Sequence, residues 1–443
     1  MENLVFSKYY LLIQKEDMYF IYNSRTNNFY RITSSLAEVI REFSLRESLE
    51  GLDEEALLLM RRMKIVVAPG DDEDYYESLK LKHYILSLSS NYMKITLAPT
   101  VWCNLKCPYC YETTKPQYKI TKEICDRVVQ FIDNNTQINS YALTWYGGEP
   151  LLCIDEIEYI LGQLKSIVGK KRRGHTMVTN GVLLKGKALN VFKEYPLDGV
   201  QITLDGNKER HDKIRVRHDG SGTFDTIVHN LIAFSQACPE THITIRVNVD
   251  KNNLAQFEEI RTFIQRLLPN KTNIRVYPGI LRGVHDCDSK NQFLKNKDVL
   301  SFHQEMARKG LPFEIYPQMI YKGCTATDLM SFVIGPKGEL YNCWEDMGIP
   351  ELEIGNIADN RLKEKKIRRY ILHGHLFDDP ICKNCKILPI CYGGCPKLRV
   401  ANKYEDGNFE LCSIYKDNDY EGLKQLLFEY FKNKDKLKLM NDI

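Results

Sequence analysis

The sequence predicts an α/β protein built on a partial (β/α)6 barrel of the TIM type, followed by a loop-rich, cysteine-rich segment. Three observations predict this fold. Strand-like and helix-like segments alternate six times between residues 93 and 310, as in a parallel sheet. Six strands are too few for a closed eight-stranded barrel, so an open sheet is expected. Ten of the 14 cysteines fall into tight spacings, which indicates metal ligation.

Composition and pattern divide the chain into five parts. They are a winged-helix-like module at 1–70, a linker at 71–92, the partial barrel at 93–310, a cysteine-rich domain at 311–412 and a C-terminal helix at 413–443. The first module is predicted from short strands at Tyr9–Gln14, Met18–Tyr22 and Asn28–Arg31, two amphipathic helices and a return strand at Ile65–Val67. The acidic run that opens the second part has no apolar periodicity, so we interpret it as a linker.

The barrel strands are predicted from clusters of β-branched and apolar residues. They are Met93–Leu97, Ala142–Trp145, Thr176–Val178, Val200–Leu204, Ile243–Val249 and Ile274–Tyr277. The helices that follow them are Lys122–Asn134, Asp155–Val168, Leu183–Glu194, Thr226–Gln236, Leu254–Leu268 and Val299–Arg308.

Charge and hydropathy exclude several classes of partner. The formal net charge is +3, so neither nucleic acid nor a membrane surface is expected as a partner. No apolar run approaches the length of about 20 residues that spans a bilayer, and the N-terminus has no signal core. The expected location is therefore cytoplasmic, where disulfides are rare and the cysteines need another role.

The first cysteine group lies just after the first barrel strand. Cys103, Cys107 and Cys110 have C-x3-C-x2-C spacing on a loop that leaves the C-terminal end of a strand, where α/β enzymes place their chemistry. Three thiolates can hold three irons of a four-iron cluster and leave the fourth iron open. A structural zinc site is the alternative, but it needs a fourth ligand, and no Cys or His stands nearby in the sequence.

Glycine turns follow the next strands at the same expected edge of the sheet. They are Gly147-Gly-Glu-Pro150, Thr179-Asn-Gly181 and Asp205-Gly206. Glycine permits close approach of the backbone to a ligand, and the shared placement of the three turns favours a binding site there.

The second cysteine group lies in a segment with little core of its own. Cys324 and Cys343 bracket a predicted hairpin, Ser331–Ile334 with Glu339–Asn342. The cysteines that follow are Cys382, Cys385, Cys391, Cys395 and Cys412. Metal ligation would supply folding energy here, and zinc is an alternative to iron and sulfide. The isolated Cys125, Cys153, Cys238 and Cys287 are interpreted as ordinary thiols.

Taken together, these motifs resemble those of a known enzyme superfamily. The C-x3-C-x2-C motif with Tyr109, followed by the turn at 147–150, resembles the radical S-adenosylmethionine (SAM) superfamily. The later seven cysteines are similar to the SPASM domain, which carries two auxiliary four-iron clusters. The N-terminal module resembles the precursor-recognition element of ribosomal-peptide maturases.

The resemblance implies a role for individual residues. Cys103, Cys107 and Cys110 would hold the catalytic [4Fe-4S] cluster. The residues expected to contact SAM are Tyr109, Gly147, Gly148, Glu149, Thr203, Arg215 and Val276. Cys382, Cys385, Cys391 and Cys412 would hold a distal auxiliary cluster. Cys324, Cys343 and Cys395 would hold a nearer one, whose fourth ligand is not identified.

The same resemblance implies radical chemistry on a peptide. The cofactors would be three [4Fe-4S] clusters and SAM. The catalytic cluster, with flavodoxin or ferredoxin as electron donor, would reduce SAM and so yield a 5′-deoxyadenosyl radical. The substrate would be a precursor peptide with a leader that pairs with a strand edge of the first module, and the product a thioether or carbon–carbon crosslink.

Two other functions remain open. One is an anaerobic sulfatase maturase that forms formylglycine. Those enzymes have another cysteine shortly after the position of Cys324 and an aspartate, the proposed base, where this chain has Trp344; Glu345 and Asp346 are the nearby candidates. The other is a non-catalytic iron–sulfur or zinc protein that binds a peptide. The turn at 147–150 counts against it, since a sensor needs no SAM-binding turn.

Overall fold

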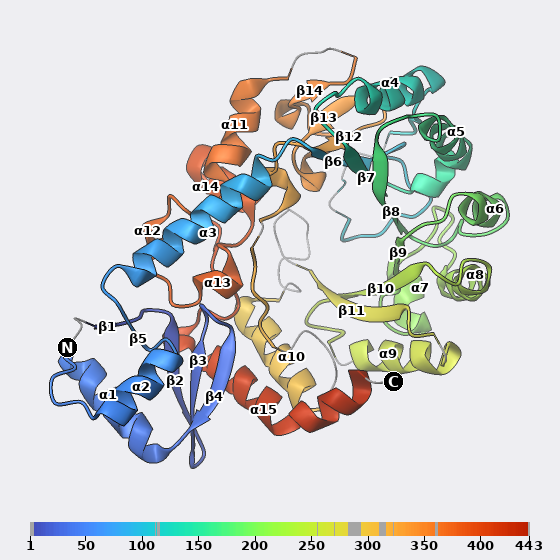
Figure 1. The fold of residues 1–443 in the computed structure, drawn as a ribbon. Helices are drawn as coiled ribbons and strands as arrows, with labels where there is room; N and C mark the ends of the chain where they lie inside the picture. Colours follow the sequence, from blue (N-terminus) through green and yellow to red (C-terminus); the bar gives the residue numbers. More distant parts are fainter. Residues whose placement is uncertain are drawn as a thin grey trace. The chain divides into compact units, whose positions relative to one another are not determined.

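The computed structural model describes residues 4–110, 112, 116–254, 256–269, 271–281, 294–309, 316–321, 323–358 and 362–441. These residues form two compact units. The first comprises Met1–Leu88, Asn296–Cys324 and Ile371–Ile443, and the second comprises Ser89–Lys295 and Thr325–Tyr370. Figure 1 labels the elements of both.

The second unit contains a nine-stranded, mostly parallel sheet in the order β11-β10-β9-β8-β7-β6-β12-β13-β14. Its first six strands are β6 (Tyr92–Leu97), β7 (Ser140–Trp145), β8 (Lys171–Thr179), β9 (Gly199–Thr203), β10 (His242–Val249) and β11 (Ile274–Ile280). All six predicted strands and the α/β class are thereby confirmed. Among the described residues, no pairing joins the end strands β11 and β14.

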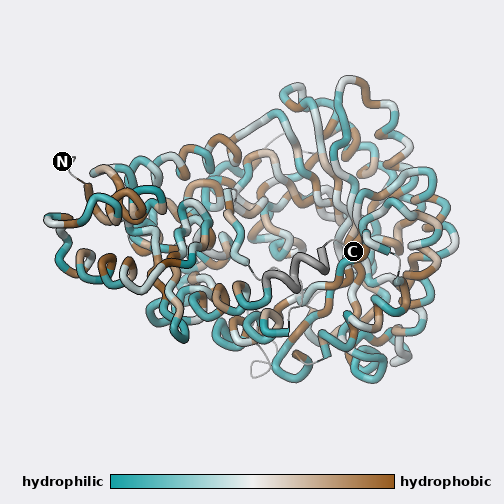
Figure 2. The backbone as a smooth tube through the Cα atoms, turned by 60° about the horizontal axis from the view of Figure 1, so that its bottom comes forward, coloured by the Kyte–Doolittle hydropathy of each residue, from teal (hydrophilic) through white to brown (hydrophobic). Residues whose placement is uncertain are grey.

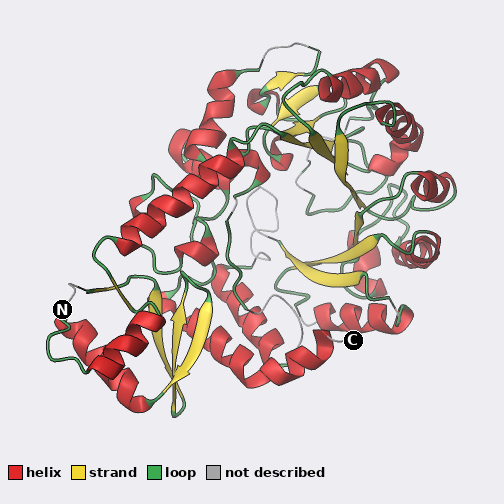
Figure 3. Cartoon of the chain, in the orientation of Figure 1, coloured by secondary structure: helices red, strands yellow, loops and turns green. Residues whose placement is uncertain are grey.

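Helices of this unit line one side of the sheet (Figure 3). They are α4 (Lys122–Asp133), α5 (Ile154–Leu164), α6 (Lys187–Glu194), α7 (Lys208–Ile214), α8 (Phe224–Ala237) and α9 (Gln256–Leu267), with the 3₁₀ helix η1 (Pro150–Cys153). Strand residues alternate accordingly: Ile243, Ile245 and Val247 of β10 are fully buried, whereas Thr244 and Arg246 between them are half-buried.

The predicted hairpin extends this sheet. β12 (Ser331–Ile334) runs parallel to β6, and β13 (Glu339–Tyr341) returns antiparallel to it, followed by β14 (Gly355–Asn356). The short 3₁₀ helices here are η2 (Thr325–Thr327), η3 (Trp344–Asp346) and η4 (Pro350–Leu352). Residues 325–370 of the predicted cysteine-rich domain therefore belong to the same unit as the barrel strands.

The first unit begins with the predicted N-terminal module. Its elements are β1 (Val5–Phe6), β2 (Tyr10–Lys15), β3 (Met18–Asn23), β4 (Asn28–Ile32), α1 (Ser34–Arg46), α2 (Glu54–Arg62) and β5 (Val66–Val67). β2, β3 and β4 form one antiparallel sheet, and the return strand β5 pairs with β1 in a separate one.

The segment interpreted as a linker is helical in the structure. α3 (Asp71–Ser87) has four acidic residues in its first turn, where their negative charges interact favourably with the positive end of the helix dipole. Its buried positions are Tyr76, Leu79, His83 and Ser87. Two of these are polar, so the stripe has no clear apolar period, and the sequence pattern did not predict the helix.

The remaining elements of the first unit come from the second half of the chain. They are α10 (Asn296–Arg308), α12 (Pro380–Lys383), α13 (Leu388–Cys391), α14 (Pro396–Tyr404), η5 (Asn418–Tyr420) and α15 (Glu421–Asn441); α11 (Glu364–His373) spans the boundary between the units. α10, predicted as the last barrel helix, packs on α15 through Ala307 and Leu426.

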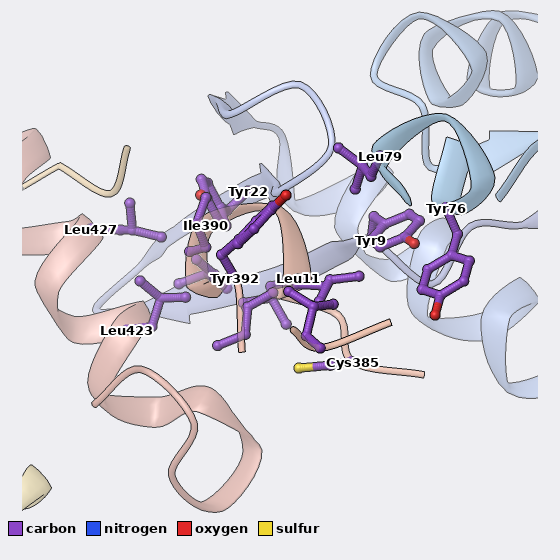
Figure 4. Packing of buried hydrophobic residues seen from close by; sticks show 14 of the residues in the cluster. Tyr9, Leu11, Tyr22, Tyr76, Leu79, Cys385, Ile390, Tyr392, Leu423 and Leu427 are labelled. Atoms are coloured by element: carbon purple, nitrogen blue, oxygen red, sulfur yellow. The ribbon is translucent and has the colours of Figure 1, made fainter. Parts of the chain in front are cut away.

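One core joins the N-terminal sheet to the C-terminal cysteine segment (Figure 4). The sheet contributes Tyr9, Leu11, Ile13, Phe20 and Tyr22. The C-terminal segments contribute Cys385, Ile387, Leu388, Ile390, Tyr392, Leu423 and Leu427. These segments are far apart in sequence and belong to one packed cluster.

The helices alternate between hydrophobic and hydrophilic stretches along their length, as Figure 2 shows. Such alternation is typical of helices that bury only one side. Within the described residues, no helix combines the length and apolarity needed to span a bilayer.

Candidate functional site

The first cysteine group lies on the loop between β6 and α4, at the C-terminal end of β6. Cys103 is buried, and Cys107 and Cys110 are half-buried. The Cys103 sulfur accepts hydrogen bonds from the Leu105 backbone N–H at 3.4 Å and from Asn180 Nδ2 at 3.7 Å. N–H donors of this kind stabilise a ligating thiolate and tune an iron–sulfur cluster, so the donor set fits the predicted one.

A second loop holds this cysteine loop in place. His218 stacks on Trp102, with ring centroids 5.6 Å apart, and its Nε2 lies 2.9 Å from the Cys103 carbonyl oxygen. The Lys106 N–H donates to the Val216 carbonyl at 3.0 Å. The loop at 216–218 thereby contacts the cysteine loop both before and after Cys103 in the sequence, as well as at Cys103 itself.

The glycine turn after β7 packs directly against the cysteine loop. Gly147 has φ of +107°, and a Cβ there would overlap the Thr100 carbonyl oxygen. A Cβ on Gly148 would overlap the carbonyl oxygens of Val101 and Trp102. These glycines are therefore required for close approach of two backbones, in addition to any contact with a ligand.

Glu149 is fully buried at the end of this turn and links the turn to η1 and to the end of β8. One carboxylate oxygen accepts from the Leu151 N–H at 3.1 Å and from Thr179 Oγ1 at 2.7 Å, and the other accepts from the Asn180 N–H at 2.7 Å. Burial raises the pKa of this carboxyl above its usual range, and the hydrogen bonds oppose that shift.

Tyr109 belongs to a second buried network, at the ends of β9 and β10. Its hydroxyl bonds with Asp205 Oδ2, accepts from Arg215 Nη1 at 2.7 Å and accepts from Asn248 Nδ2 at 3.2 Å. Asp205 lies 3.6 Å from Arg215 and accepts the Asn248 N–H at 2.8 Å. Burial raises the pKa of Tyr109 well above its usual range, so the hydroxyl stays neutral.

Arg215 also fits an anionic ligand. Its side chain is buried, and its Nε atom has no hydrogen-bond partner among the described residues. A buried guanidinium N–H without an acceptor costs free energy, so a carboxylate at this point would be favoured.

The register of the sheet separates two residues that the sequence analysis placed together. Thr203 pairs with Arg246, which pairs with Tyr277, so these three side chains share one face. Val276 pairs with the fully buried Ile245 and therefore lies on the opposite face, toward the helices. The structure brings Cys103 and Glu149 to one edge through Asn180, and it does not bring Val276 to the face of Thr203.

The second cysteine group is divided between the two units. Cys324, Cys382, Cys385, Cys391, Cys395 and Cys412 belong to the first unit, and Cys343 belongs to the second. Arg399 Nη2 donates to the Cys382 sulfur at 3.6 Å, and Cys385 lies 3.9 Å from the Tyr420 hydroxyl. Burial raises the pKa of Cys382 to about 11, while Arg399 lowers it.

Within the described ranges, no three Cys, His, Asp or Glu side chains form a ready metal-binding group. The cluster ligands therefore remain predictions. Cys125, Cys153 and Cys238 are buried single thiols, and Cys287 lies outside the described residues.

The two acidic candidates near Cys343 differ in their surroundings. Asp346 is fully buried and accepts a hydrogen bond from the Tyr370 hydroxyl at 2.7 Å. Glu345 is half-buried on the same 3₁₀ helix. Their role as proton acceptors stays a prediction.

Three residues of the site were not singled out from the sequence. Asn180 was seen only as part of a turn, and Asn248 and His218 not at all. Asn180 follows β8 directly, so its place at the same edge of the sheet was a usable signal. His218 has no such signal, because its contact with Trp102 spans more than a hundred residues.

These features define an α/β protein with a three-thiol loop at the C-terminal edge of a mostly parallel sheet. Comparison with known families agrees, since residues 97–264 match the model of the radical SAM superfamily. Residues 97–264 therefore form a radical SAM domain, and the chain is an enzyme; a domain of this family implies a [4Fe-4S] cluster and SAM.

Relatives align along most of the chain. The cysteine-type anaerobic sulfatase-maturating enzyme of Clostridium novyi is 24% identical over 360 residues, covering 74% of this chain and 94% of the relative. The serine-type enzyme of Bacteroides thetaiotaomicron is 24% identical over 362 residues, covering 71% and 85%.

Two solved structures share the fold. The anSMEcpe structure with bound AdoMet and Cp18Cys peptide has a TM-score of 0.61 at 20% identity, over 79% of this chain and 99% of that one. Streptococcus suis SuiB bound to precursor peptide SuiA has a TM-score of 0.53 at 16% identity, over 93% and 99%.

Proposed function

We propose that this chain is a radical SAM peptide maturase that oxidatively crosslinks a ribosomally made precursor peptide, with a thioether or carbon–carbon bond as the product. The observation that carries the proposal is the network linking the three-thiol loop to the glycine turn through Asn180 and Glu149. It joins a predicted cluster ligand, Cys103, to a predicted SAM contact, Glu149, at one edge of the sheet.

The chain's own residues would bind and orient the cofactors. Cys103, Cys107 and Cys110 would hold the catalytic cluster, and Arg215 would hold the SAM carboxylate through a guanidinium already fixed by Tyr109 and Asp205. When bound, cluster and SAM supply a 5′-deoxyadenosyl radical. The seven later cysteines would hold two auxiliary clusters, which suit a net oxidation by accepting an electron. A flavodoxin or ferredoxin would supply the first electron.

The surroundings of Trp344 support a peptide crosslinker over a sulfatase maturase. Trp344 packs on Tyr146, with ring centroids 4.5 Å apart, beside a cluster that contains Val101 of the cysteine loop. The position where sulfatase maturases have the proposed base is therefore occupied here by a packing residue. The curated relatives nevertheless carry the sulfatase-maturating name, so formylglycine formation stays the second candidate.

The class of enzyme is tested by anaerobic reconstitution of the full chain with iron and sulfide. We expect about twelve irons per chain, as three four-iron clusters require, and reductive cleavage of SAM to 5′-deoxyadenosine. Bound zinc without SAM cleavage would show that the chain is instead a non-catalytic metal protein.

The reaction is tested by offering the reconstituted enzyme two substrates. One is a candidate leader-bearing precursor peptide, to be sought in short reading frames beside the gene, and the other is a sulfatase-type cysteine peptide. A crosslink lowers the mass of the precursor by two hydrogens, which mass spectrometry detects. Formylglycine is an aldehyde and is detected by its reaction with a hydrazide probe. Hydrazide-reactive product from the second peptide alone would replace our proposal by the sulfatase-maturase function.

Leader recognition is best tested on the peptide, with the enzyme kept whole. We propose that the leader pairs with an edge strand of the β2-β3-β4 sheet, whose two outer strands are β2 and β4. A precursor without its leader should then be modified far more slowly than the complete one. Equal rates would exclude the leader hypothesis while leaving the crosslinking activity intact.

A further inference from the structure

Arg246 lies on the face of the sheet that the helices leave uncovered within the second unit. It is half-buried in β10, in register with Thr203 of β9 and Tyr277 of β11. The flanking residues of β10, Ile245 and Val247, are fully buried on the helix side. The guanidinium therefore belongs to the same face as the predicted SAM contact Thr203.

The hydrogen-bond partners of Arg246 are all neutral. Its Nε donates to Asn248 Oδ1 at 2.7 Å, and its Nη1 donates to the Tyr277 hydroxyl at 3.5 Å. Tyr277 is itself held by Gln201, whose Oε1 accepts its hydroxyl at 2.7 Å. No carboxylate of the described residues forms an ion pair with Arg246, although other buried or half-buried cations of this unit have one.

The contrast with its neighbours is specific. Arg215 lies 3.6 Å from Asp205, and Arg210 lies 2.7 Å from Asp250. Lys94, on β6, lies 2.6 Å from Asp328. A half-buried cation without a counter-ion is costly, because desolvation is not repaid by an attractive partner. Arg246 is thus a site on this face that an incoming anion would complete.

The β11 backbone at Gly279, which pairs with Asn248, leaves room for the Arg246 guanidinium. A Cβ placed on Gly279 of β11 would lie 2.8 Å from Cζ and 2.9 Å from Nη2 of Arg246. Glycine inside a strand often marks a place where another group approaches closely. Gly279, Asn248 and Tyr277 therefore hold the Arg246 guanidinium in one orientation. This lowers the conformational entropy that Arg246 loses when it binds a carboxylate.

The site also lies next to the predicted SAM contacts. Asn248, which holds Arg246, donates through its Nδ2 to the Tyr109 hydroxyl at 3.2 Å. Tyr109 is the aromatic residue of the three-cysteine motif. Arg246 accordingly lies two hydrogen bonds away from that motif.

We propose that Arg246 binds a carboxylate of the peptide substrate, an aspartate or glutamate side chain or the C-terminus, and so positions the peptide over the sheet. This inference rests on the proposed function, because the carboxylate is carried by the peptide. SAM also carries a carboxylate, and the test separates the two sources.

The direct test uses N-acetylglutamate α-amide and N-acetylglutamine α-amide as probes. Both are titrated into the full-length, iron–sulfide-reconstituted protein with SAM present, and binding is followed by saturation-transfer NMR. We expect binding of the glutamate probe only, about tenfold weaker in Arg246→Gln, as expected for loss of one charged hydrogen-bonded pair. Gly279→Ala should weaken binding in the same direction by displacing the guanidinium while retaining its charge.

Arg173→Gln serves as the matched control, because Arg173 is exposed on β8. It should bind the glutamate probe as the wild type does. Equal binding of both probes, or unchanged binding in Arg246→Gln and Gly279→Ala, would overturn the proposal. Thermal unfolding of each variant shows that it is folded.

A separate arm measures SAM affinity by equilibrium dialysis. We expect Arg246→Gln to change the SAM dissociation constant by less than about twofold. A tenfold loss of SAM affinity with unchanged probe binding would assign the carboxylate to SAM and overturn the peptide assignment. Probe binding needs no turnover, so failure of SAM cleavage would count against the proposed function alone.

Discussion

At the scale of single residues, His175 shows how burial fixes a protonation state. It is buried in β8, where its Nε2 accepts from Trp145 Nε1 at 2.8 Å and its Nδ1 lies 2.9 Å from the Pro196 carbonyl oxygen. These partners require the neutral tautomer with hydrogen on Nδ1. Burial lowers the pKa of His175 from 6.5 to about 4.

This lowered pKa predicts a loss of stability in acid. Above pH 6.5 both folded and unfolded states are neutral at His175, and between pH 6.5 and about 4 only the unfolded state takes up the proton. The free energy of unfolding should therefore fall by about 3 kcal/mol as pH drops through this window. Urea unfolding at pH 7 and pH 4.5 measures this change in the free energy of unfolding.

His175→Gln should remove most of that pH dependence, since glutamine does not titrate. His242→Gln is the control, because His242 is exposed at the start of β10. If His175→Gln loses as much stability between the two pH values as the wild type, His175 is not the group responsible.

The candidate site residues could be selected from local sequence motifs, whereas the side chains that hold them in place could not. The three-cysteine motif and the glycines at 147 and 148 are local patterns. Asn180 and Asn248 are single amides whose importance depends on contacts with Cys103 and Tyr109, 77 and 139 residues away. Those contacts exist only once β6, β8 and β10 share a sheet edge.

At the scale of elements, the glycine turn and the cysteine loop behave as one structure. A Cβ on Gly148 would meet backbone carbonyl oxygens of the cysteine loop, which cannot move aside as a flexible side chain can. Gly148→Ala should therefore destabilise the protein by about 1–3 kcal/mol, the usual cost of overpacking.

The same substitution should lower iron bound after reconstitution, because the Cys103 backbone has to shift. Gly162→Ala provides the control. A Cβ on Gly162, in α5, would lie at an ordinary 3.6 Å from the Tyr195 hydroxyl, and alanine favours a helix. Unchanged iron content and stability in Gly148→Ala would show that the turn and loop are not mechanically linked.

Periodicity explains which elements could be predicted. The six barrel strands and the helices between them bury regular apolar faces, so the spacing of apolar residues in each segment predicts its secondary structure. α3 buries His83 and Ser87 beside Tyr76 and Leu79. Because two of these four residues are polar, its buried face can be recognised only from the residues that pack on it. His83 Nδ1 lies 2.9 Å from the Tyr392 hydroxyl, a partner 309 residues away.

At the scale of the whole molecule, the N-terminal module and the C-terminal cysteine segment form parts of one core. Tyr9, Ile13, Phe20 and Tyr22 are fully buried in the same cluster as Ile387 and Ile390. Polar contacts add to it, since Tyr76 donates to the Phe377 carbonyl at 2.7 Å and Lys8 Nζ donates to the Lys383 carbonyl at 2.9 Å. This shared core could not be predicted from the sequence, because a local pattern of apolar residues does not indicate which distant segment packs against it.

This shared core predicts that the N-terminal module cannot be removed without harm to the proposed distal cluster. Deletion of residues 1–70 would expose the cluster side of Ile387, Leu388 and Ile390, between the predicted ligands Cys385 and Cys391. We expect the truncated chain to bind about four irons fewer than the full chain after reconstitution, as loss of one four-iron cluster requires.

A point substitution tests the same link without removing the module. Phe20→Ala opens a cavity in this core and should cost about 3–5 kcal/mol, with a parallel loss of distal-cluster iron. Leu58→Ala is the matched control, because Leu58 lies in α2 of the same module and is 57% exposed. Full iron content in both the truncated chain and Phe20→Ala would show that the cysteine segment folds independently. Reduced iron in these two alone would mean that the N-terminal module supports an auxiliary cluster as well as any leader it binds.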